Sequence, residues 1–175
     1  TIPNLTYAAT QLFKRVSNQI TYRHLNQPSV YNGYLVLAGN AIHEIWDIST
    51  PTNPVWKQTL MSPHRFGEAE SHQVSYSRTA SGTCYMVTIS GRGIDIWNMT
   101  VTENPTLVSS LELPNINYGD VAGGIWGVYW HGDTIYAGAT VYGLYVIDVS
   151  NPAAPQHVKT LSQSGLGGVS AGPLF

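Results

Sequence analysis

The stretch Gly143–Pro155, which reads GLYVIDVSNPAAP, decides the fold of this chain. It is an apolar run, then an acidic residue, then a turn with two prolines. Related stretches stand upstream at Ile45–Pro54 (IWDISTPTNP) and Ile96–Pro105 (IWNMTVTENP). Their equivalent positions 45, 96 and 146 lie 51 (96 − 45) and then 50 (146 − 96) residues apart. The chain is therefore built from repeats of one unit.

Each unit divides into short runs that are rich in β-branched and aromatic residues and are bounded by turn residues. Four such runs predict one four-stranded antiparallel sheet, which is a blade of a β-propeller. The sequence therefore predicts an all-β fold with about three to three and a half blades, part of a larger propeller. The expected blades are residues 28–61, 72–111 and 125–161.

A short polar side chain stands near the end of the third run in every unit. It is Asp47 in the first, Asn98 in the second and Asp148 in the third. A side-chain oxygen at this place can accept a hydrogen bond from a backbone N–H of the turn that follows. We interpret these residues as structural.

The third unit resembles the LVIVD repeat, in which an apolar strand and an aspartate precede the pattern Ser-x-Pro-x-x-Pro. The first unit matches well, whereas the second departs from the pattern at Asn98 and Thr102. The resemblance covers about residues 28–161. It implies a β-propeller, often of an exported bacterial protein, and it leaves the activity open.

The composition excludes some classes of function. Only 10% of the residues are charged and the net charge is −2, so there is no basic surface for nucleic acid. No apolar run reaches the roughly 20 residues that span a bilayer. The low charge and the high content of Thr, Asn and Tyr favour an exported protein that is periplasmic, cell-surface or secreted. A processed N-terminus, or a sequence that shows only part of the chain, would explain why Thr1 has no methionine before it.

The ends of the chain do not make complete repeats. Residues 1–27 are expected to be an N-terminal extension or a strand of a preceding blade, and residues 162–175 the start of a following one. Since propellers close with about four to eight blades, three explanations stay open. The chain is a fragment of a longer propeller, it is completed by another polypeptide, or two copies pair into a ring. We favour further blades or a protein partner that completes the ring.

One polar stretch stands out on the predicted channel face. His64–His72 contains two histidines and two acids. Imidazole and carboxylate groups bind transition metals such as zinc or copper. The candidate metal ligands are His64, Glu68, Glu70 and His72, although their spacing matches no standard metal motif.

Other loops of that face supply further candidates. They are the binding residues His43, Arg92, Asp120 and Tyr142. Separately, the aromatic candidates for a surface that contacts a partner or a glycan are Tyr31, Tyr118, Tyr129, Trp130 and Tyr142.

Two functions follow from these observations. The first is a non-enzymatic binding or assembly module without a cofactor, and its ligand is unknown. The alternative is a metal-dependent oxidase or hydrolase with its site around His64–His72. The sequence favours the first, because the repeats are regular and no recognisable catalytic set is present.

Overall fold

The computed structural model describes residues 25–39, 42–64, 73–78, 82–117 and 124–172. These residues form three antiparallel sheets of four strands each. Sheet 1 contains β1 (Leu25–Tyr31), β2 (Tyr34–Gly39), β3 (Ile42–Asp47) and β4 (Val55–Met61). Sheet 2 contains β5 (Val74–Arg78), β6 (Cys84–Ser90), β7 (Gly93–Asn98) and β8 (Thr106–Glu112). Sheet 3 contains β9 (Gly127–His131), β10 (Thr134–Ala139), β11 (Gly143–Asp148) and β12 (Gln156–Leu161). A 3-10 turn, Ser164–Leu166, follows β12.

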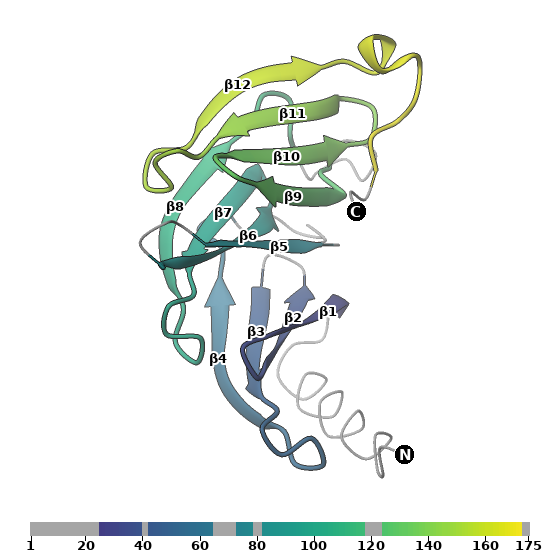
Figure 1. Cartoon of the computed structure of the whole chain (residues 1–175). Helices are drawn as coiled ribbons and strands as arrows, with labels where there is room; N and C mark the ends of the chain where they lie inside the picture. Colours follow the sequence, from purple (N-terminus) through teal and green to yellow (C-terminus); the bar gives the residue numbers. More distant parts are fainter. Residues whose placement is uncertain (1–24, 40–41, 65–72, 79–81, 118–123, 173–175) are drawn as a thin grey trace.

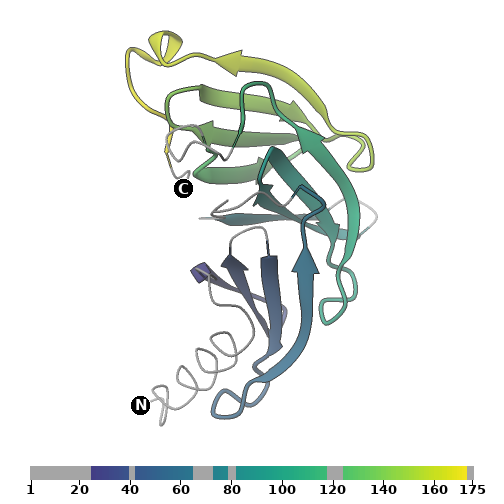
Figure 2. The same ribbon diagram turned by 180° about the vertical axis from the view of Figure 1, so that it is seen from behind.

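The three sheets follow one another as an arc (Figure 1). The first strands of the sheets, β1, β5 and β9, lie on its concave side, and the last strands, β4, β8 and β12, lie on its convex side. The view from behind shows the same order (Figure 2). This arrangement confirms the prediction of an all-β fold made of propeller blades.

Apolar side chains fill both seams between neighbouring sheets. Between sheets 1 and 2, Ile45 packs in one cluster with Met86 and Trp97. Between sheets 2 and 3, Ile96 and Ile147 belong to a second cluster. Sheet 2 is therefore covered on both faces, which explains the nearly continuous apolar sequence of its two central strands.

The repeated polar residue at the end of the third strand has the structural role that the sequence predicted. The Asp47 carboxylate accepts a hydrogen bond from the N–H of Ser49 at 2.9 Å. Asn98 accepts the equivalent bond from Thr100, and Asp148 accepts it from Ser150. The Asn98 amide thus replaces the usual carboxylate without loss of the turn.

The strand boundaries differ from the prediction by a few residues. The largest difference is in β1, which begins at Leu25, before the start of the first expected blade at residue 28. Its hairpin to β2 is an Asn-Gly turn, with φ values of 49° at Asn32 and 79° at Gly33. Such a turn matches the twist of the strands that it joins. Among the described residues, no helix is long and apolar enough to cross a membrane.

Candidate functional site

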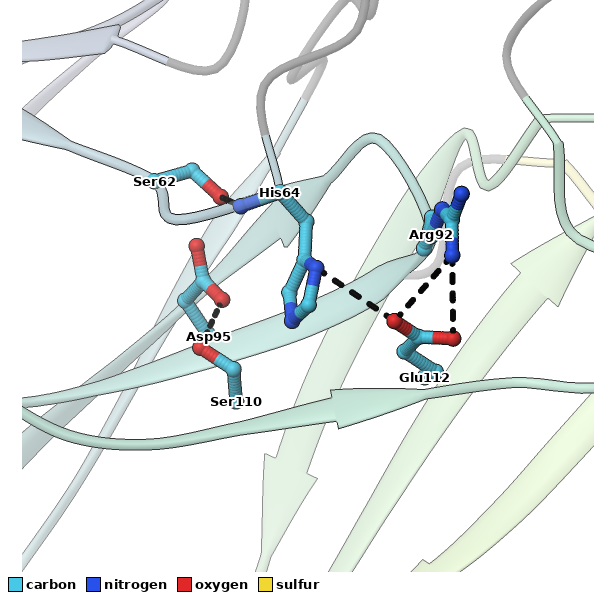
Figure 3. A network of polar contacts seen from close by, with 6 residues as sticks. All are labelled: Ser62, His64, Arg92, Asp95, Ser110 and Glu112. Carbon is cyan, nitrogen blue, oxygen red and sulfur yellow. Dashed lines mark hydrogen bonds and ion pairs between the residues drawn. The ribbon is translucent and has the colours of Figure 1, made fainter.

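A network of polar side chains lies where the end of sheet 1 meets sheet 2 (Figure 3). Its exposed rim is made by His64, which follows β4, and by Arg92 and Glu112 of sheet 2. One Glu112 carboxylate oxygen lies 3.4 Å from Nδ1 of His64 and 3.4 Å from the Arg92 guanidinium. A backbone bond from the N–H of Gly91 to the carbonyl of His64, 3.0 Å long, holds the two segments together.

The interior of this network is buried. Asp95 of β7 faces sheet 1 and has no exposed surface. One of its carboxylate oxygens accepts a 2.6 Å hydrogen bond from the Ser110 hydroxyl. Burial raises the pKa of Asp95, while hydrogen bonds from Ser110 and Ser62 and the nearby His64 act in the opposite direction. The other oxygen, Oδ2, has no partner at hydrogen-bond geometry among the described residues.

His43 lies in the same seam, at the start of β3. It is fully buried, and neither ring nitrogen has a hydrogen-bond partner among the described residues. Its ring meets the edge of Trp97, with ring centres 6.4 Å apart. Burial lowers the pKa of His43 to about 4, so the ring is neutral at pH 7. The structure therefore places this predicted binding residue inside the molecule.

The other predicted site residues have different surroundings. Glu68, Glu70, His72 and Asp120 lie outside the described residues. Tyr142 is partly buried against the cluster between sheets 2 and 3. Among the predicted site residues that are described, only His64 and Arg92 share a partner, which is Glu112. In the described part of the chain, no group of three or more His, Cys, Asp or Glu side chains could hold a metal ion. The metal site at His64–His72 stays a prediction.

Sequence reasoning missed Asp95, Ser110 and Glu112. One signal was present, because Asp95 interrupts the apolar run Ile94–Trp97 of a strand that is covered on both faces. A carboxylate at such a position needs polar neighbours. The Ser110 hydroxyl is that neighbour, and the sequence separation of 15 residues hides the pair from a local pattern.

The chemistry of the network is that of hydrogen bonding and ion pairing. Arg92 and Glu112 are about half exposed, so their contact is worth at most about 1 kcal/mol. The His64 contact is long for a hydrogen bond. This rim can take part in the binding of a polar partner.

Comparison with known proteins agrees with the repeats read from the sequence and seen in the structure. Residues 122–161 match the family model of the LVIVD repeat, whose members form β-propeller repeats. This segment of the chain is similar to an LVIVD repeat. The matched LVIVD segment contains the whole of sheet 3, from β9 to β12. Sheets 1 and 2 lie outside that match and have the same four-stranded order.

A solved structure of a β-propeller also resembles the chain. It is the crystal structure of Sqt1 from Saccharomyces cerevisiae, with a TM-score of 0.50 and 18% sequence identity. The similar region covers 73% of this chain and 31% of the Sqt1 chain. At this identity the likeness concerns the fold alone. No curated protein matches the sequence.

Proposed function

We propose that this chain is a non-enzymatic binding and assembly module of an exported protein. Its binding surface is the face of sheet 3 that points away from sheet 2, and the partner is a further four-stranded sheet. The low content of charged residues supports export, since the surface relies on uncharged polar side chains.

The observation that carries the proposal is a difference between equivalent positions. Ile45 of sheet 1 and Ile96 of sheet 2 are fully buried, because the next sheet packs on them. Val146 is the equivalent residue of sheet 3 and remains partly exposed. Leu144 and Tyr136, which share this face with Val146, are also only partly buried. Sheet 3 thus presents the same apolar face without a sheet to cover it.

The end of the described chain already approaches this face. Ala171 forms an antiparallel bridge with Thr140, just beyond β10. A side chain at Gly138 would collide with the carbonyl oxygen of Gly172. The terminal segment therefore covers one end of the face and leaves the region around Val146 for a partner.

The experiment compares the native mass of the wild-type particle with that of Val146→Asp, both isolated from cells that express the chain. The wild type is expected in a particle larger than the 19.1 kDa of one chain. Val146→Asp should return it to one chain, because a charge cannot be buried at the contact without a partner. A wild type that runs as a single chain, or a particle that tolerates Val146→Asp, would refute the proposal.

A further inference from the structure

Where sheets 2 and 3 pack together, side chains of sheet 2 bind the unpaired edge of the inner strand β9. β9 is an edge strand, so alternate N–H groups have no partner within its own sheet. The N–H of Val128 donates to Oε1 of Gln73 at 3.2 Å, and the N–H of Trp130 donates to Oγ of Ser75 at 3.0 Å. Side chains of the preceding inner strand therefore satisfy the backbone of the next one.

Sheet 3 lacks the side chains that would bind the inner strand of a following sheet in this way. The strand pairings place Gly127 where Gln73 stands in sheet 2, and Tyr129 where Ser75 stands. Gly127 has no side-chain acceptor, and Tyr129 offers an aromatic ring instead of a short hydroxyl. An ordinary inner strand docked here would bury an unpaired N–H beside Gly127, which costs about 1–3 kcal/mol.

Sheet 1 has an inner strand that avoids this cost. Pro28 of β1 occupies the position that Val128 has in β9, and proline has no N–H. Both Pro28 and Val30 are exposed, Val30 by 66%. Their counterparts in β9, Val128 and Trp130, are buried against sheet 2. Among the described residues, no sheet covers the inner strand of sheet 1 on the side where an earlier sheet would stand.

We propose that sheet 3 of one copy of this chain docks on sheet 1 of a second copy, through β9 and β1. This inference rests on the proposed function and names its partner. Pro28 of the second copy lies nearest Gly127, which is already buried in the single chain beside the terminal segment, so no acceptor is needed there. Val30 of the second copy packs on the ring of Tyr129, which is 42% exposed in the single chain.

The shape of the molecule agrees with such a pair. The arc of sheets is open on its concave side (Figure 1), and a second arc can face it there. The same head-to-tail contact, made twice, closes a ring instead of a filament.

Sedimentation equilibrium of the purified chain tests this pairing. The wild type should have twice the mass of one 19.1 kDa chain. Pro28→Val adds a backbone N–H that has no acceptor across the contact. Gly127→Gln adds a side-chain carbonyl that has no N–H donor across the contact. Because the contact is made twice, each is expected to raise the dissociation constant about a hundredfold, equivalent to about 2.8 kcal/mol. The double variant recreates the pair found between Gln73 and Val128, and should return the constant to within a few-fold of the wild type.

Tyr129→Asp is the second variant, in case Gly127→Gln disturbs the nearby chain end. It should abolish the pair while the far-ultraviolet circular dichroism of the single chain stays unchanged. A purified wild type with the mass of one chain overturns the pairing, as does a dimer that is indifferent to both Pro28→Val and Tyr129→Asp. If the particle from cells contains another protein and only one copy of this chain, the pairing fails and the binding role stands.

Discussion

His43 occupies a position that sheets 2 and 3 fill with the aliphatic residues Ile94 and Leu144. Its imidazole is buried in the seam and makes no hydrogen bond to the described part of the chain. Burial of such a group costs free energy of folding. In the unfolded chain the imidazole is hydrated and, at low pH, protonated. The residue therefore gives the seam between sheets 1 and 2 a dependence on pH.

We expect the stability of the wild type to fall as the pH is lowered from about 6.5 to about 4. In this window the unfolded chain protonates His43 and the folded chain does not, because the pKa of the buried ring is about 4. The contribution is of the order of 3 kcal/mol. Asp95 has the opposite effect, because its pKa is raised in the folded chain. The folded chain binds a proton at this carboxylate more readily than the unfolded chain does, which offsets part of the loss of stability.

The variant His43→Leu isolates this contribution, because it keeps Asp95 in place. Urea denaturation at several pH values should show equal or higher stability at pH 7, where two unpaired nitrogens are removed. The difference between variant and wild type should widen toward pH 4. Parallel curves for the two proteins would mean that His43 does not titrate within the seam.

Single residues of the turns could be predicted from the sequence. Asp148 and its two counterparts were recognised, because the partner N–H is only two residues away. His64 and Arg92 were named as candidates, but their common partner Glu112 was not. Glu112 is 20 positions from Arg92 (112 − 92) and 48 positions from His64 (112 − 64) along the chain. Their contact therefore depends on how two sheets stack.

At the scale of the element, glycine fixes the entry to the third strand. Gly143 begins β11 with a φ of 87°, and a side chain there would meet the carbonyl oxygen of Leu161. Gly93 begins β7, and a side chain there would meet the carbonyl oxygen of Leu111. The third and fourth strands of both sheets approach each other closely at this point.

Gly143→Ala should lower the free energy of unfolding by about 2 kcal/mol or more, since both the backbone conformation and the contact resist a side chain. Gly172→Ala is the matched control, because a side chain there meets nothing and the backbone conformation is ordinary. Urea denaturation of both variants checks this. Equal losses would show that the close approach of β11 and β12 is not needed for folding.

The strands themselves could be predicted with errors of a few residues. Hydrophobic runs and turn residues are local signals, so they indicate strands such as β10 (Thr134–Ala139) directly. β1 was placed too late, because its start at Leu25 carries no turn signal and its sequence LNQPSVY includes a proline. An edge strand tolerates that proline, since the missing N–H faces away from the ladder.

At the scale of the whole molecule, the period of the sequence predicted that similar sheets follow one another. It could not predict which side chains meet where two sheets pack together. A repeat shows that the units are alike, whereas function depends on where they differ. Gln73 and Ser75 bind the next inner strand, and Gly127 and Tyr129 cannot do so in the same way. This contrast appears only when the strand register aligns the sheets.

The central claim is that sheet 3 presents, uncovered, the face that sheet 2 buries. The most direct measurement is the free energy of unfolding of Ile96→Asp and Val146→Asp, at concentrations low enough to keep chains apart. Ile96→Asp should lose about 4 kcal/mol or fail to fold, because it buries an unpaired charge. Val146→Asp should lose about 1 kcal/mol or less, as at an exposed site. Equal losses at the two positions would contradict the account.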